Sequence, residues 1–163
     1  MYKRFDFIWA SPECYTHTKM SVFPRVKKEL PDLRLYSIVI FLDRFFDGYY
    51  AVENVIPYYK PLIKPTAVVD RHYIWANFQL RDKKFPNNSR GNIKDLTIEK
   101  LCEYLQIDLD LILAAKLKNE RNHDPKSQAL RNCVLPKAGK YILDQAINQT
   151  QKNLEKYILG DVK

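Results

Sequence analysis

The first fifty-five residues combine strand and helix signals in an order that restricts the fold. A short apolar run at Phe5–Trp9 leads into a polar loop that ends at Cys14. Apolar residues at helical spacing then cover Asp32–Phe46, and a second short run, Tyr49–Val52, ends in Glu53-Asn54-Val55. Strand, helix and strand in this order form a βαβ unit with parallel neighbouring strands. The chain is therefore expected to have an α/β fold, although the β-branched run Ile38–Ile40 keeps a strand interpretation of that part open.

Each of the two predicted parallel strands ends in a polar group, Cys14 after the first and Glu53 after the second. The carboxyl ends of parallel strands lie at one edge of a sheet, where α/β proteins collect ligands and catalytic groups. This placement makes Cys14 a candidate nucleophile and Glu53 a candidate acid. The alternatives are that Cys14 is a small buried apolar residue and that Glu53 is a solvated acid. His17 is expected to be an exposed loop residue.

The rest of the chain alternates between turn signals and helical patterns. Two short strands, Ala67–Val69 and His72–Phe78, are expected to form an antiparallel hairpin around Asp70-Arg71, where Arg71 could be a simple turn residue. The basic segment Arg81–Lys94 contains Pro86 and Gly91 and is expected to be an exposed loop near an anionic surface. Helices are predicted over 97–105 (with Thr97 as the cap), 109–118 and 138–159. A charged break is expected over 119–126, and a distinct segment at 128–136.

Composition narrows the class of protein further. With 163 residues, the chain is one domain or a fragment of a larger one, and its net charge of +8 favours an anionic partner, nucleic acid first. Three widely spaced cysteines argue against a disulfide framework and a zinc cluster, so no metal site is expected. No apolar run has the length of a membrane span, and a cytoplasmic location follows as the default. Four scattered glycines form no nucleotide-binding loop.

Four segments, in order, resemble motifs of the DNA (cytosine-5) methyltransferases, especially a phage and bacterial branch. Ser11-Pro-Glu-Cys14 is similar to that family's Pro-Pro-Cys motif, and Val52-Glu-Asn-Val55 to its Glu-Asn-Val motif. Asp70-Arg-His-Tyr-Ile-Trp75 is similar to the end of its Gln-x-Arg-x-Arg motif, and Gln128–Pro136 to its late Gly-Asn-x-Val segment. The resemblance covers most of the chain except residues 80 to 125.

The resemblance implies a role for each matching residue. Cys14 would attack carbon 6 of a cytosine flipped out of double-stranded DNA, and Glu53 would stabilise the charge that develops on ring nitrogen 3. Arg71 would contact the base or its phosphate. Asn54 would orient the catalytic loop or contact the substrate. The remaining expected contacts are Arg81 with the substrate and Asn132 with the cofactor, S-adenosylmethionine. A positive surrounding would be needed to lower the pKa of the Cys14 thiol.

The resemblance also implies an architecture. The expected fold is a partial doubly wound, Rossmann-like methyltransferase sheet, mostly parallel, with flanking helices and a small C-terminal helical part. Residues 1–80 would form the catalytic α/β portion and residues 81–127 a short variable segment facing DNA. Residues 128–163 would pack back on the catalytic portion.

Several family features are missing. The chain lacks the Phe-x-Gly-x-Gly loop that binds S-adenosylmethionine, Ala67 and Val69 replace the Gln and first Arg of one motif, and Arg131 replaces the Gly before Asn132. The expectation is therefore a split or truncated methyltransferase, with a possible second chain supplying the cofactor-binding half. The alternatives are an inactive DNA-binding remnant and, more distantly, a structural α/β domain without a role in nucleic-acid binding.

Overall fold

The computed structural model describes residues 5–18, 30–86, 96–117 and 124–160. The chain divides into two compact units. The first comprises Met1–Lys84 together with Ile142–Lys163, and the second comprises Phe85–Tyr141. The described strands all belong to the first unit, which is therefore the unit that carries the sheet.

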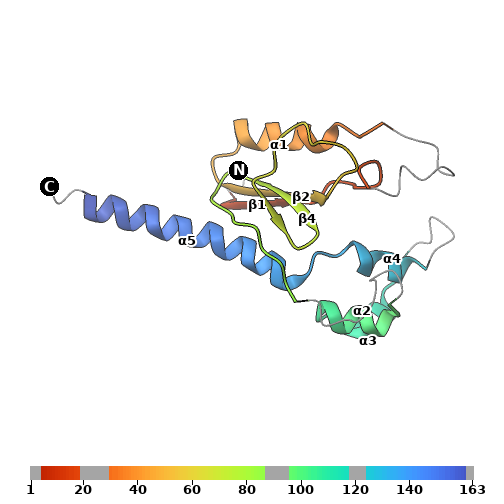
Figure 1. Ribbon diagram of the computed structural model, residues 1–163. Coiled ribbons are helices and arrows are strands. Elements are labelled where there is room, and N and C mark those ends of the chain that lie inside the picture. Colours follow the sequence, from red (N-terminus) through yellow and green to blue (C-terminus); the bar gives the residue numbers. More distant parts are fainter. Residues whose placement is uncertain (1–4, 19–29, 87–95, 118–123, 161–163) are drawn as a thin grey trace. The chain divides into compact units, whose positions relative to one another are not determined.

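The sheet has four strands in the order β1-β2-β4-β3 (Figure 1). They are β1 (Phe7–Ala10), β2 (Tyr49–Val55), β3 (Ala67–Val69) and β4 (His72–Ala76). Strand β1 runs parallel to β2, whereas β2 with β4 and β3 with β4 are antiparallel. The fold is thus α/β with a mixed sheet, and the expectation of a mostly parallel sheet was wrong for the described strands. The reason is the tight turn between β3 and β4, where Asp70 adopts a φ of 55° and the chain reverses.

Helix α1 (Arg34–Phe45) connects β1 to β2 and covers one face of the sheet (Figure 1). Its buried residues recur at helical spacing and pack against Tyr50, Val52 and Trp75 of the sheet: Leu35, Tyr36, Val39 and Leu42. This spacing is what stabilises a helix on a sheet, because one stripe of the helix removes its apolar side chains from water. The predicted βαβ unit is confirmed, and the strand interpretation of Ile38–Ile40 was wrong.

Helix α5 (Pro136–Gly160) joins the sheet unit from Ile142 onward. There the Nδ2 of Asn153 lies 3.4 Å from the hydroxyl of Tyr49, and Gln149 Oε1 accepts a hydrogen bond from the backbone N–H of Gln79 at 2.8 Å. Tyr49 follows the alternation of the strand and faces away from Tyr50, which packs against α1. Helix α5 therefore covers the opposite face of the sheet. The predicted helix over 138–159 is confirmed.

The second unit is helical in its described part. Its core, formed by Leu96, Leu101, Cys102, Leu105 and Leu130, joins α2 (Ile98–Leu105) to α4 (Pro125–Asn132). The cap predicted at Thr97 is confirmed, since its side chain accepts from the N–H of Lys100. The unit extends to Tyr141, beyond residue 127, because Leu130 is buried in this same core.

Two helices of this unit differ from expectation. Helix α3 spans Leu109–Ala114, shorter than the predicted 109–118, and residue 118 lies outside the described residues. Helix α4 was not predicted, because its residues were assigned to a charged break and a distinct segment. The helix begins there because Asp124 caps the N–H groups of Lys126 and Ser127 and Pro125 occupies the first turn.

Much of the predicted exposed loop Arg81–Lys94 falls on residues 87–94, outside the described residues, while residues 81–84 are exposed. Among the described helices, not one has the combination of length and apolar character that crossing a membrane requires.

Candidate active site

The loop that carries Cys14 follows β1 directly and is shaped by local hydrogen bonds. The Cys14 carbonyl accepts from the backbone N–H groups of His17 at 3.0 Å and Thr18 at 3.1 Å, which closes a turn behind the thiol. On the strand side, Trp9 Nε1 donates to the hydroxyl of Ser11 at 2.8 Å. The Cys14 side chain is half-buried.

Asn54 of β2 holds this loop against the sheet. Its side chain is 1% exposed, and its Nδ2 donates to the carbonyl of Pro12 at 3.0 Å. Its Oδ1 accepts from the N–H of Val55 at 3.0 Å. The side-chain amide is thus engaged with backbone groups, which fits the expectation that Asn54 orients the catalytic loop. Its contact with substrate stays a prediction.

Glu53 precedes Asn54 in β2 and is buried, with 7% of the residue exposed. Burial raises the pKa of the Glu53 carboxyl, and a hydrogen bond from Ser11 and the charge of Arg71 oppose this shift. A raised pKa increases the population of the protonated acid. Glu53 is therefore suited to donate a proton or a hydrogen bond.

His72, which the sequence reasoning did not select, also contacts Glu53. Its Nε2 lies 3.4 Å from Glu53 Oε1. Glu53 pairs with Ile74 in the β2–β4 register, so His72 is its diagonal neighbour on the same face of the sheet. Burial and the nearby charge of Arg71 lower the pKa of His72 to about 4. Because both shifts favour neutral forms, the contact joins a neutral imidazole to a carboxyl group that holds its proton more readily than usual. The sequence feature that could have identified His72 was its position directly after Arg71.

The three residues predicted to be catalytic lie in one electrostatic neighbourhood. The charge of Glu53 raises the pKa of the Cys14 thiol, and the charge of Arg71 lowers it. Arg71 also acts on Glu53 and His72. Arg71 itself is exposed in the turn between β3 and β4. The structure thus brings Cys14, Glu53 and Arg71 together from three separate segments of the chain.

The electrostatic effect on the thiol is the reverse of the one expected. The pKa of Cys14 is raised, first by burial and then by the negative charge of Glu53, with a further contribution from Glu13. Arg71 lowers the pKa by less than these effects raise it. Among the described residues, the positive charge of Arg71 is therefore outweighed by burial and by the two acidic side chains. At neutral pH the thiol is mostly protonated, and it needs a base or a nearby positive charge to react as the thiolate.

His17 is buried rather than exposed, so the expectation of an exposed loop histidine was wrong. The residue is 1% exposed, and its Nδ1 lies 2.5 Å from the hydroxyl of Tyr59, which also accepts a hydrogen bond from Tyr36 of α1 at 3.2 Å. Within the described residues, His17 Nε2 has no hydrogen-bond partner. Burial lowers the pKa of His17. This contact ties the Cys14 loop to α1 and to the segment after β2.

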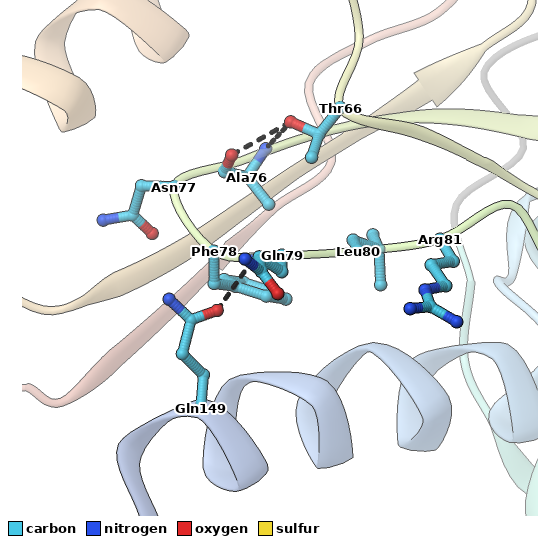
Figure 2. Close-up of a pocket in the computed structure, with 8 residues that line it drawn as sticks. All are labelled: Thr66, Ala76, Asn77, Phe78, Gln79, Leu80, Arg81 and Gln149. Carbon is cyan, nitrogen blue, oxygen red and sulfur yellow. Dashed lines mark hydrogen bonds between the residues drawn. The ribbon is translucent and has the colours of Figure 1, made fainter. Parts of the chain in front are cut away.

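The other two predicted site residues lie elsewhere. Arg81 lines a cavity of about 590 Å³ between the segment that follows β4 and helix α5 (Figure 2). The other lining residues are Thr66, Ala76, Asn77, Phe78, Gln79, Leu80 and Gln149, so the cavity does not include Cys14, Glu53 or Arg71. Asn132 is the last residue of α4, in the second unit. The roles of Arg81 in substrate binding and Asn132 in cofactor binding stay predictions.

No cluster of three or more histidine, cysteine or acidic side chains in the described ranges could hold a metal ion. Comparison with known proteins gave no match to a family model, a curated protein or a solved structure.

Proposed function

We propose that the chain is the cytosine-activating part of a DNA (cytosine-5) methyltransferase. The observation that carries the proposal is geometric: Cys14 follows β1, Glu53 lies near the end of the parallel strand β2, and the pairing of Val55 with His72 puts the turn that contains Arg71 at that same end of β2. In this proposal the mixed sheet is part of a doubly wound, Rossmann-like sheet. A nucleophile, a buried acid and a cation in one place are the groups that attack on a pyrimidine ring requires.

Each of the three side chains has a distinct task in the proposed reaction. The Cys14 thiolate forms a bond to carbon 6 of cytosine, and the electron pair of the 5,6 double bond moves into the ring toward nitrogen 3. Glu53 donates a proton or hydrogen bond there, and its raised pKa supports that role. Carbon 5 becomes an enamine carbon that accepts an electrophile. Water takes the proton from carbon 5, nitrogen 3 returns its proton to Glu53, and the Cys14 sulfur leaves carbon 6 as a thiolate, which restores the aromatic ring.

The thiol must lose its proton before it attacks, and the free chain holds that proton because the pKa of Cys14 is raised. Arg71 is exposed beside the site, where it can pair with a phosphate or the base. The net charge of +8 supports a polyanionic substrate.

The described residues do not fit a complete site for S-adenosylmethionine, the methyl donor of such a reaction. Among the described glycines, Gly48 closes the turn before β2, where an added Cβ would meet Phe46 and Asp6. Gly139 and Gly160 lie inside α5. None of these three glycines therefore lies in a glycine-rich loop whose backbone could bind a nucleotide. The proposal therefore assigns the donor site to a second chain and assigns this chain the activation of cytosine.

A reaction that needs no methyl donor tests this assignment. Attack at carbon 6 makes carbon 5 exchange its hydrogen with water, so a duplex labelled with tritium at cytosine carbon 5 should release tritium in the presence of the chain. Release should vanish in Cys14→Ser and fall at least tenfold in Glu53→Gln. Cys133→Ser is the matched control, because Cys133 is also a half-buried free thiol with a raised pKa. It should release tritium at the wild-type rate.

The same assay distinguishes the alternatives. Salt-sensitive DNA binding without tritium release would identify an inactive DNA-binding remnant. Among the alternatives to an enzyme, the raised pKa of Cys14 and the incomplete donor site favour this one. Negligible binding to duplex DNA at low salt would instead indicate a structural α/β domain.

A further inference from the structure

The two edges of the sheet differ in how they are covered. At the β3 edge, Lys83 donates its backbone N–H to the carbonyl of Val68 at 2.9 Å, and its carbonyl accepts from the N–H of Asp70 at 2.6 Å. The N–H of Val68 donates to Asp82 Oδ1 at 2.8 Å. The segment that follows β4 therefore satisfies the backbone groups of this edge.

Among the described residues, no segment covers the β1 edge in this way. Strand β1 is last in the strand order, and within the described part of the chain it pairs with β2 alone. Its four residues, Phe7–Ala10, include neither charge nor proline. Charged side chains, proline and bulges are the usual means by which proteins prevent an edge strand from pairing with another chain. The β1 edge is thus open to a further strand.

Helix α1, which packs over β1 and β2, leaves large apolar side chains in water. Ile40 is 54% exposed, Phe41 60% and Phe45 75%, and the rings of Phe41 and Phe45 lie 5.3 Å apart. Ile8 and Ala10 of β1 pack into the cluster that α1 covers, so α1 contacts the edge strand from one face of the sheet. A partner that adds a strand beside β1 and packs against α1 would bury these rings.

We propose that the β1 edge and the exposed face of α1 form a docking surface for a second polypeptide of net negative charge, which adds a strand to the sheet. An extended backbone is the partner that satisfies a row of unpaired N–H and C=O groups. The described part of Phe85–Tyr141 contains helices and no strand. A second copy is disfavoured, because it would bring a charge of +8 against +8. The inference does not rest on the proposed methyl transfer.

Photo-crosslinking locates the partner. p-Benzoylphenylalanine would replace Phe5, which is 61% exposed beside β1, or Phe45 of α1, in cells that carry the gene in its natural setting. Tyr157 of α5, which is 75% exposed like Phe45, is the control position. We expect both test positions to form an adduct with one acidic polypeptide that the control does not form. An adduct between two copies of this chain, equal adducts at Tyr157, or none at Phe5 and Phe45 would overturn the proposal.

The captured polypeptide is then purified and tested for strand addition. Its binding should slow amide hydrogen exchange of residues 7–10 at least tenfold and leave β3 within twofold. Its affinity should fall with added salt, and at least tenfold in the double variant Phe41→Lys/Phe45→Lys, with Tyr157→Lys unaffected. Protection elsewhere without protection of β1 would refute strand addition. DNA is absent from these measurements, so their outcome is independent of the tritium assay.

Discussion

The side-chain amide of Asn54 and the carbonyl of Pro12 are joined by a hydrogen bond of 3.0 Å, which fixes the loop of the candidate nucleophile to strand β2. Asn54 follows Glu53 in the same strand, so their side chains leave opposite faces of the sheet. Glu53 raises the pKa of Cys14 through its charge, and Asn54 holds the Cys14 loop through its bond to Pro12. The position of the thiol therefore depends on a residue that does not act on it directly.

Replacing Asn54 by alanine should release this loop. The variant loses the bonds to Pro12 and Val55 and leaves the half-buried carbonyl of Pro12 without its donor, which costs about 1–3 kcal/mol of unfolding free energy. Amide exchange over residues 11–15 should accelerate by more than the global loss of stability explains. Urea unfolding and hydrogen exchange measure the two effects.

Asn77 provides the matched control. Its Oδ1 accepts from the N–H of Tyr50 and its Nδ2 donates to the carbonyl of Gly48, both at 2.9 Å. Asn77→Ala also removes two bonds from a side-chain amide to the backbone, but Asn77 is exposed, so it should lower stability by less and leave the relative exchange of residues 11–15 unchanged. Equal acceleration in both variants would mean that the Pro12 bond does not govern the loop.

The raised pKa of Cys14 predicts a slow thiol with a steep pH dependence. Alkylation by iodoacetamide, followed by mass spectrometry of the Cys14 peptide, should keep accelerating as the pH rises past 9.0, the ordinary pKa of a cysteine thiol. Glu53→Gln removes a charge that raises this pKa, so its alkylation should be faster than wild type at pH 8. Arg71→Met removes a charge that lowers the pKa, so it should be slower.

Cys133 in the same samples is the internal reference, since its pKa is raised by burial and no charge from the candidate site is among the causes. Its alkylation rate should be the same in both variants. The prediction fails if Glu53→Gln and Arg71→Met change the Cys14 rate in the same direction.

Periodic features of the sequence predicted the fold well. The alternation of apolar run, helical stripe and apolar run predicted the βαβ unit, because burial of one face imposes a period on the residues. The hairpin at Asp70-Arg71 followed from the turn between two β-rich runs, and its antiparallel strands are what make the sheet mixed. Helix α4 was missed because its start depends on the Asp124 cap and Pro125, while its apolar content is low.

The candidate site was predictable only where residues follow strand ends. Cys14 and Glu53 are in that position, and the parallel pairing of β1 with β2 brings them together. His72 and His17 were not identified, because their burial depends on contacts distant in sequence, with Glu53 in one case and Tyr59 in the other. The sign of the Cys14 pKa shift likewise depends on burial and on summed charges, which no local pattern encodes.

His72 should make the protein less stable in mild acid. Its pKa falls from 6.5 in the unfolded chain to about 4 in the folded protein. Between these values the unfolded chain binds a proton that the folded protein does not bind. Stability is therefore full above pH 6.5 and falls as the pH decreases toward 4, by about 3 kcal/mol from this residue.

Urea unfolding of wild type and His72→Gln at pH 7, 6, 5 and 4 measures this contribution. The glutamine amide can still bond Glu53 but does not titrate, so the variant should lose less stability than wild type from pH 7 to pH 4. Subtracting the two curves removes the contribution of the carboxylates, which titrate in both proteins. Parallel curves would show that His72 is not buried as a neutral group.

Gly48 and Gly139 should respond in opposite directions to the same substitution. A Cβ at Gly48 would lie 2.6 Å from Cζ of Phe46 and 2.7 Å from the carbonyl oxygen of Asp6, so Gly48→Ala must displace backbone at the start of β2. We expect a loss of about 1–3 kcal/mol in unfolding free energy. Gly139 lies inside α5 with nothing within 4 Å of the added atom, and Gly139→Ala should stabilise by up to about 1 kcal/mol. Thermal unfolding of both variants beside wild type is the measurement, and a Gly48→Ala protein as stable as wild type would show that Asp6 and Phe46 can move away without cost.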